Sequence, residues 1–350
     1  MKRFVLRSLV ALLPVLLLVA LYVIKDPFRV LRPGDGAATP GDTVALTVNT
    51  GYQSVETFKR HNAELHYDSF IFGSSLSGYY RVGDWKKHLP EDASPIHFNA
   101  SRETLQGILN KLHFLASRGV HVAHALIVME DEMLQRKPLD SDVLYVQHPQ
   151  TTPKVSWWEF HQLYFNAFRH PELVAFTLWP SQATARLVLE RGYATTDIPA
   201  RIEPVNESYY AWADSLISVD AGAFYTSAHL AKYSHPLRKQ PCTDKVTPAV
   251  EDLLRQIARA LKEQGTDYQI IIPPHYATEA ISSADLFALE SIFGNERVHD
   301  YSHDPVMGGD LHYYYDDGHL IASVCAQLMD SAYAAVTLPS PYLRATADNR

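Results

Sequence analysis

The feature that most constrains the fold is a short apolar run that ends abruptly in Gly73-Ser74-Ser75. Residues 70–72 read Phe-Ile-Phe, which is typical of a parallel strand that is buried on both faces. Gly73 would let the backbone turn sharply after this strand, so that Ser75 would lie at its carboxyl end. Open α/β sheets form their binding sites at that edge. The run therefore predicts a fold class and the place of a site.

Strands and helices alternate on both sides of this run. We expect strands at 68–73, 95–99, 121–129, 267–272 and 297–301. We expect helices at 55–65, 102–118 (capped by Ser101), 250–264 (after Thr247-Pro248), 284–293 and 319–336. Such alternation is typical of an α/β domain with a parallel sheet. We place this domain at 66–337, followed by a tail at 338–350 that looks disordered.

Residues 134–243 break the alternation and contain aromatic-rich helical stretches, such as the one that begins with Trp157-Trp158. We interpret the segment as a helical insertion rather than an independent domain. Aromatic side chains at helical spacing usually belong to a core. A lid, or a surface for a membrane or a polysaccharide, is the alternative.

The first 25 residues resemble a membrane anchor. An apolar segment at 4–24 approaches the ~20 residues that cross a bilayer, and Lys2, Arg3 and Arg7 place its positive end in the cytoplasm. The main domain would then be periplasmic or extracellular, in a single-pass membrane protein. A cleaved signal peptide is the rival reading, but residues 20–26 lack a small-residue cleavage pattern. Residues 26–65 would form a tether, or an irregular packed segment, and a leading helix.

Composition excludes some classes of function. The formal net charge of −8 argues against a nucleic-acid partner. The two cysteines, Cys242 and Cys325, have no CxxC neighbour, so neither a zinc ribbon nor a redox motif is supported. They could pair in an exported protein, but we favour two free, mostly buried thiols.

The second half of a possible site lies near the other end of the chain, in Asp316-Asp317-Gly318-His319. A serine hydroxyl is a weak nucleophile that needs an imidazole to take its proton, and the imidazole needs a carboxylate on its other nitrogen. We expect Ser75 to be the nucleophile, His319 the base and Asp316 the orienting carboxylate. Ser74 is the alternative nucleophile.

These two motifs resemble the first and last blocks of the SGNH/GDSL hydrolase superfamily. Together with the N-terminal anchor, they are most similar to DltD-type and alginate-acetylation-type members. The resemblance implies a flavodoxin-like, three-layer α/β fold and a Ser75, His319 and Asp316 triad without a cofactor. It also implies a serine esterase or O-acyltransferase that acts on an acylated cell-envelope polysaccharide beside a membrane-bound O-acyltransferase partner.

The middle blocks depart from the family pattern. Arg102 stands where the family has a Gly, and Glu130 and Asp131 stand where it has an Asn that binds the oxyanion. Carboxylates accept hydrogen bonds and make poor oxyanion donors. Either the N–H groups of Ser75 and Arg102 serve instead, or the site is slow, specialised or inactive. The oxyanion or pocket candidates are Gly73, Ser74, Asn99, Arg102, Glu130, Asp131 and, in the loop after strand 267–272, His275.

Two alternatives to the enzyme remain open. The first is a catalytically inactive accessory protein that binds a glycan or a membrane-bound O-acyltransferase. The second is a metal-dependent hydrolase, because His and Asp residues cluster at 299–312. No helical His spacing supports a metal site there, so we interpret this cluster as a solvated polar loop and expect no metal.

Overall fold

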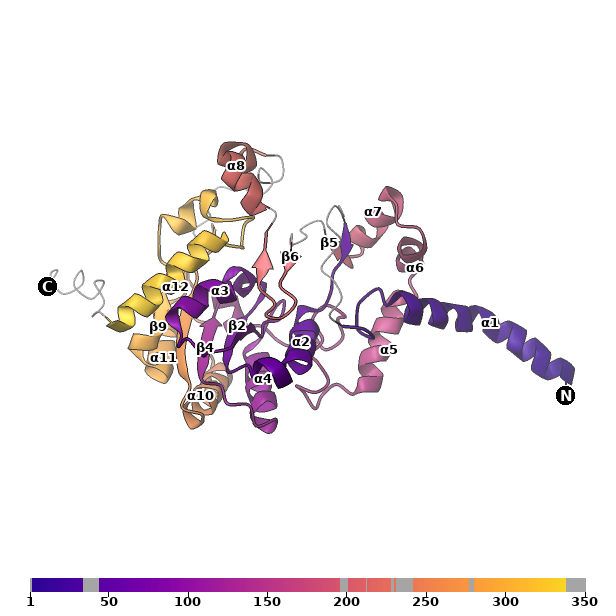
Figure 1. Cartoon of the computed structure of the whole chain (residues 1–350), viewed down its shortest axis with the longest axis horizontal. Helices are drawn as coiled ribbons and strands as arrows, with labels where there is room; N and C mark the ends of the chain where they lie inside the picture. The colour runs from indigo at the N-terminus through magenta and orange to yellow at the C-terminus, as the bar shows by residue number, and fades with distance from the viewer. Residues whose placement is uncertain are drawn as a thin grey trace.

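The computed structural model describes residues 2–33, 44–195, 201–211, 213–227, 230, 242–276 and 280–337, without the side chains of 2–10 and 335–337. The predicted tail at 338–350 and residues 34–43 of the predicted tether lie outside the described residues. Figure 1 shows an α/β body at the C-terminal side and a smaller helical lobe from which the N-terminal helix extends.

A five-stranded parallel sheet forms the centre of the body, which confirms the α/β prediction. Its order is β3-β2-β4-β8-β9, with bounds Ser69–Gly73 (β2), Pro95–His97 (β3), His124–Val128 (β4), Asp267–Ile272 (β8) and Val298–Asp300 (β9). From β2 the chain passes first to β3 on one side and later to β4 on the other. The carboxyl end of β2 is thus the switch point at which open sheets bind ligands.

Helices cover both faces of this sheet. Phe70 and Phe72 join the core on one face, and Ile71 joins the core on the other. The first face is covered by α2 (Thr50–Leu65), α4 (Leu105–Ser117), α10 (Pro248–Glu263) and α11 (Ser283–Phe293), and the second by α3 (Val82–Trp85) and α12 (Ala322–Thr337). Burial on both sides explains why β2 is apolar without alternation.

Helix starts differ from the prediction at three places. The first is α2, which begins at Thr50 rather than at residue 55. Ser101 does not cap α4; Thr104 does, and its side chain accepts a hydrogen bond from the Gly107 N–H at 3.0 Å. The last helix begins at Ala322 rather than at His319. Tyr314 and Leu320 form an antiparallel bridge, and this bridge holds His319 on a short hairpin before the helix.

The insertion is mostly helical, as predicted, but it also contains short strands. Its elements are α5 (Trp157–Phe168), α6 (Pro171–Leu178), α7 (Gln182–Glu190), β5 (Ala194–Thr195), β6 (Arg201–Ile202), β7 (Tyr209–Tyr210) and α8 (Ala213–Tyr225). β5 pairs with β1 (Ala45–Leu46), and β6 pairs with β7. Phe160, Tyr164 and Phe168 are buried in one cluster, so this part of the aromatic stripe is core, whereas Trp157, Trp158 and Trp179 are exposed.

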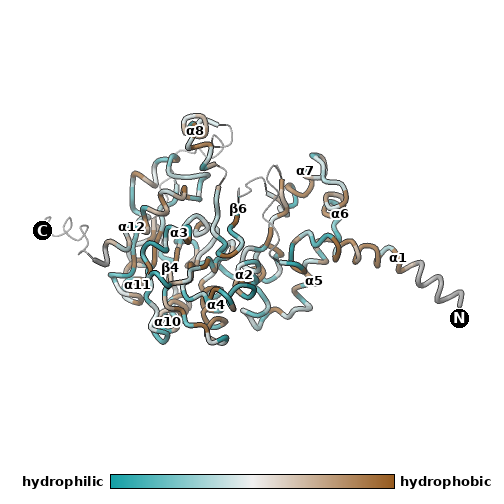
Figure 2. Tube along the Cα trace, in the orientation of Figure 1, coloured by the Kyte–Doolittle hydropathy of each residue, from teal (hydrophilic) through white to brown (hydrophobic). Residues whose placement is uncertain are grey.

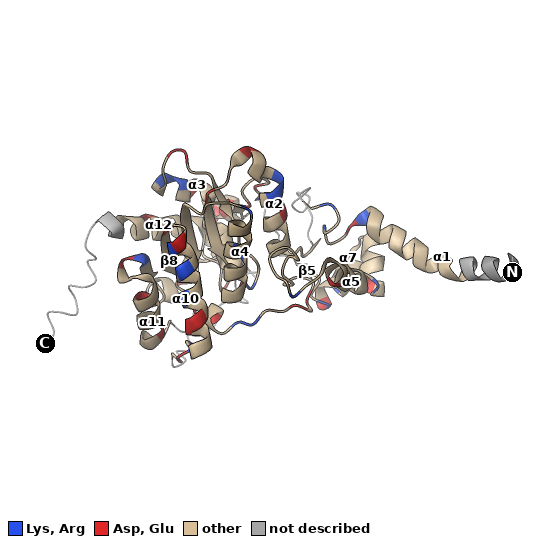
Figure 3. Ribbon diagram, turned by 90° about the horizontal axis from the view of Figure 1, so that it is seen from below, with Lys and Arg blue, Asp and Glu red and all other residues tan. Residues whose placement is uncertain are grey.

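Among the described side chains of the N-terminal helix α1 (Lys2–Lys25), those near its C-terminal end pack on the lobe. Tyr22 contacts Phe165 and Phe168, with ring centroids 5.6 and 5.3 Å apart. Phe28 and Val30 are buried, so the predicted tether begins as a packed segment. Residues 11–24 contain no charged side chain, and α1 extends away from the body as an apolar rod (Figures 2 and 3). A search of the described part of the chain found no helix with the length and apolarity to cross a membrane.

Candidate active site

The turn after β2 determines which serine faces solvent. Gly73 has φ 157°, and a Cβ there would lie 2.8 Å from Ser77 Cβ and 2.9 Å from Val128 O, so only glycine fits. Ser74 is buried and caps the short 3₁₀ helix η1 (Ser75–Tyr79), since its hydroxyl accepts from Leu76 N–H at 3.3 Å. Ser75 lines a cavity. Of the two serines, Ser75 is the one placed to react.

The hairpin before α12 brings the other two predicted residues to Ser75. Asp316 Oδ1 accepts from the backbone N–H groups of Gly318 (2.8 Å) and His319 (2.7 Å). Asp316 Oδ2 is 2.8 Å from His319 Nδ1, and His319 Nε2 is 3.2 Å from Ser75 Oγ. Both distances are within hydrogen-bond reach, which proton transfer between the groups requires. The two ends of the chain therefore meet in one hydrogen-bonded series.

The charge on Asp316 fixes the state of the imidazole. Burial alone would raise its pKa, but the hydrogen bond and charge of His319 and the two backbone donors lower the pKa of Asp316 to about 2. The carboxylate is therefore ionised at neutral pH and holds the proton on His319 Nδ1. The Nε2 lone pair is left facing the Ser75 hydroxyl, which is the arrangement that a general base requires.

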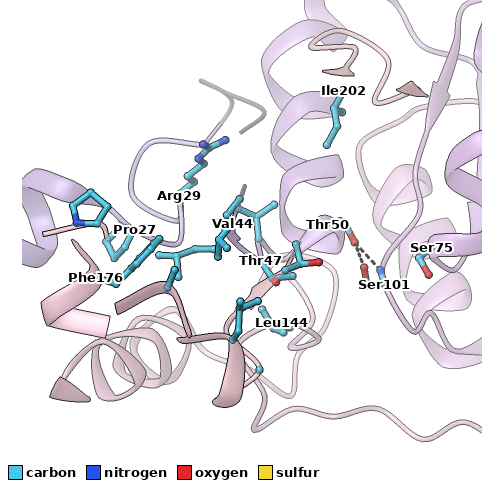
Figure 4. A pocket seen from close by; sticks show the side chains of 18 of the residues that line it. Pro27, Arg29, Val44, Thr47, Thr50, Ser75, Ser101, Leu144, Phe176 and Ile202 are labelled. Carbon is cyan, nitrogen blue, oxygen red and sulfur yellow. Dashed lines mark hydrogen bonds between the residues drawn. The ribbon is translucent and has the colours of Figure 1, made fainter. Parts of the chain in front are cut away.

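The three residues line a cavity of about 1100 Å³ between the body and the lobe. Ser75 lies at one end of the view in Figure 4, and Pro27, Arg29 and Phe176 lie at the other. Toward the lobe the wall is largely apolar, and Val44 and Leu144 contribute to it (Figure 4). The body thus supplies the reactive groups, and the lobe supplies the opposite wall.

Aromatic residues that were not predicted also line this cavity. The Tyr79 ring centroid is 5.9 Å from that of His319, and Tyr209 and Tyr145 contribute further rings. Tyr79 follows Ser75 in the same short helix, so its sequence position was an available signal. Tyr145 and Tyr209 belong to the insertion region, where no local pattern marked them.

The two acidic candidates, Glu130 and Asp131, lie away from the cavity that contains Ser75. Glu130 is paired with Arg136, which also contacts Glu132 at 3.1 Å. Asp131 is paired with Lys245. Neither Glu130 nor Asp131 lines the cavity that contains Ser75. The prediction that they line this pocket is wrong, because Glu130 turns to Arg136, six positions along the chain, and Asp131 turns to Lys245, 114 positions away.

The remaining candidates Asn99, Arg102 and His275 do not line the cavity that contains Ser75. Asn99 is buried and does not line the cavity, and its carbonyl accepts from Ser54 Oγ at 3.0 Å. Arg102 has φ 54° and lines a smaller neighbouring cavity, with its guanidinium 5.6 Å from the Tyr145 ring centre. The His275 ring packs against Gly318, where an added Cβ would be 3.4 Å from it. Burial lowers the pKa of His275, so a neutral ring supports the hairpin.

The His- and Asp-rich segment forms separate pairs. His299 bonds Gln269 (2.8 Å), His303 bonds Asp300 (2.7 Å) and His312 bonds Asp310 (2.6 Å). Within the described ranges, no three His, Cys, Asp or Glu residues are grouped so that they could hold a metal ion. Both cysteines are free; Cys325 is buried, but Cys242 is exposed, contrary to expectation.

Comparison with known proteins gives no relative from which a role could be transferred. No model of a known protein family matches the chain, and a search of curated proteins found no significant match. The geometry of Ser75, His319 and Asp316 must therefore carry the functional argument.

Proposed function

We propose that this protein is a serine esterase or O-acyltransferase of the SGNH type, attached to a membrane, that acts on an acylated cell-envelope polysaccharide. The observation that carries the proposal is the hydrogen-bonded series from Ser75 Oγ through His319 to Asp316 at the wall of a cavity. The sheet order, 2-1-3-4-5 when its strands are numbered along the chain, supports a flavodoxin-like fold.

The chemistry follows from the positions of the protons. Ser75 Oγ attacks the acyl carbonyl while its proton moves to His319 Nε2, and Asp316 stabilises the resulting imidazolium. The tetrahedral intermediate collapses, the bond to the leaving alcohol breaks, and His319 returns the proton to that alcohol. Water or a sugar hydroxyl then attacks the acyl-enzyme with His319 as the base, which frees Ser75.

The size and position of the cavity support a polymer substrate. About 1100 Å³ exceeds the volume that a single acetyl ester needs and lies near the upper end of ordinary ligand sites. Tyrosine rings and hydroxyl groups line it, and both suit sugar rings. Lys25, the last residue of α1, lines the same cavity, so a membrane-attached α1 would hold the site close to the bilayer.

The reaction is tested with the full-length protein in detergent. Wild-type protein should hydrolyse a chromogenic acetyl ester and be labelled covalently by a serine-directed phosphonate. Ser75→Ala should lose both, whereas Ser74→Ala, which keeps the nucleophile, should still be labelled. A wild-type protein with neither turnover nor labelling contradicts the proposal. Acetate release from, or acetyl transfer to, polysaccharides would then identify the substrate.

A non-catalytic accessory protein is the second candidate. Trp158 and Trp179 on the lobe are 77% and 71% exposed, which is unusual for such large rings and suits binding to a glycan or a protein partner. Under this hypothesis Trp158→Ala and Trp179→Ala would weaken glycan or partner binding, and Ser75→Ala would not. Labelling of Ser75 by the phosphonate decides between the two candidates.

A further inference from the structure

The proposed reaction needs a hydrogen-bond donor beyond the triad. Attack on the acyl carbonyl places a negative charge on its oxygen, and donors that face this oxygen supply much of the rate enhancement. Glu130 and Asp131 cannot serve, since they accept hydrogen bonds and are paired with Arg136 and Lys245. Other groups at the Ser75 end of the cavity must do so, and a side-chain donor would add to the backbone N–H of Ser75.

Ser101 is held next to the turn that carries Ser75. In the β2–β3 pairing Ile71 is opposite His97, and the contact continues beyond the strands. Phe98 N–H donates to Ile71 O at 2.8 Å and Ala100 N–H donates to Gly73 O at 3.1 Å. Ser101 directly follows Ala100, and Ser75 is two residues after Gly73. Both serines line the cavity, and Figure 4 shows them at the same end of it.

The first turn of α2 fixes the Ser101 side chain. Thr50 Oγ1 donates to Ser101 Oγ at 3.0 Å and accepts from Ser101 N–H at 2.6 Å (Figure 4). A Cβ on Gly51 would lie 2.8 Å from Ala100 Cβ, so the helix approaches this segment as closely as glycine allows. Both the backbone N–H and the side-chain hydroxyl of Ser101 are therefore hydrogen-bonded to Thr50.

These two hydrogen bonds leave the hydroxyl hydrogen of Ser101 available to a ligand. A serine hydroxyl has one hydrogen and two lone pairs, and the bond from Thr50 uses a lone pair. Among the hydrogen bonds of the described residues, Ser101 Oγ donates none. The hydrogen is thus directed away from Thr50, on a side chain that lines the cavity. The positive end of the α2 dipole at Thr50 also favours a negative charge there.

We propose that Ser101 is a catalytic residue whose hydroxyl donates a hydrogen bond to the oxyanion formed on Ser75 attack, and that Thr50 positions it. This inference rests on the proposed function. As the Ser75 Oγ–carbon bond forms, the carbonyl π electrons move to oxygen and the Ser75 proton moves to His319. Ser101 transfers no proton; its hydrogen bond strengthens as the charge develops and weakens when the carbonyl re-forms.

Steady-state kinetics on the full-length protein tests the inference. Ser101→Ala should lower kcat for the chromogenic ester by about 10²–10³-fold, with KM nearly unchanged. Ser101→Thr and Thr50→Ser keep a hydroxyl and should retain most activity, whereas Thr50→Val should lose activity. Ser291→Ala removes an exposed hydroxyl that bonds its own helix and is the matched control.

An aryl trifluoromethyl ketone separates this role from a structural one, because it forms a charged tetrahedral adduct with Ser75. Ser101→Ala should weaken its inhibition by a factor similar to the loss in kcat, at an unchanged melting temperature. Equal inhibition of wild type and Ser101→Ala overturns the inference about Ser101 but leaves the proposed esterase function intact. A wild-type protein without turnover or labelling overturns both. If Ser101→Ala fails to fold, a Thr50→Val protein with full activity is the overturning result.

Discussion

Two loops at the same edge of the sheet carry carboxylates, and they use them differently. In the hairpin before α12, Asp316 is bonded to His319, whose second nitrogen faces the cavity. In the loop after β4, Glu130 and Asp131 are paired with Arg136 and Lys245. An imidazole exchanges protons near neutral pH, whereas guanidinium and ammonium groups remain charged. The partner, rather than the acidic residue itself, separates a carboxylate that orients an imidazole from one that is held in an ion pair.

The largest expected effect comes from exchanging Asp316 for Asn. The amide cannot stabilise the imidazolium and favours the wrong tautomer of His319, so kcat should fall about 10⁴-fold. Asp131→Asn, the matched change in the other loop, should leave kcat unchanged. Ester hydrolysis by the two purified variants measures this difference. Comparable losses in kcat for the two variants would contradict the different roles assigned to Asp316 and Asp131.

The next effect concerns stability. Glu130→Gln leaves the Arg136 charge without its buried partner, which should lower the free energy of unfolding by about 3 kcal/mol. Glu132→Gln removes the exposed partner of the same arginine and should change it by less than about 1 kcal/mol. Urea denaturation measures both values. If the two variants unfold alike, Glu130 does not hold the loop.

A third carboxylate, Glu207, has neither kind of partner. Thr57 donates a hydrogen bond to it, and Arg60 is the cation of the described residues that favours its ionisation. Burial raises the pKa of Glu207 from 4.5 to about 7, against the smaller effects of Thr57 and Arg60. The folded state thus binds the proton more tightly, and stability should fall by about 3 kcal/mol as pH rises from 4.5 through 7. Denaturation at several pH values should show this slope in wild type and not in Glu207→Gln.

The smallest effect is a pH dependence of stability that comes from Asp316 and has the opposite sign to that of Glu207. Since its pKa falls from 3.8 to about 2 on folding, its contribution is present above 3.8 and is lost as the pH falls toward 2. The loss should be about 2 kcal/mol. Acid denaturation of Ser75→Ala with and without Asp316→Asn isolates it. Identical acid midpoints would mean that the Asp316–His319 bond contributes nothing to folding.

Much of the body could be predicted from local patterns. The apolar run at 267–272 gives β8 with the same bounds, and Thr247-Pro248 begins α10 as expected. Gly73 and the Asp-x-x-His spacing lead to a serine and a histidine that meet, because both depend on a tight turn.

Contacts between distant residues could not be predicted. Lys245 is 114 positions from Asp131, so no local pattern pairs them. Ser101 and Thr104 are both good helix caps. The choice of Thr104 follows from the contact of Ser101 with Thr50, 51 positions earlier. Predicting that choice requires the packed molecule.

The 244 positions between Ser75 and His319 have a consequence for how the protein is made. A ribosome that has just incorporated Ser75 must add a further 244 residues before His319 is in the chain. Throughout that time the nascent chain carries an inert alcohol. Under the proposed function, reactivity toward esters therefore begins only after residue 319 has been added.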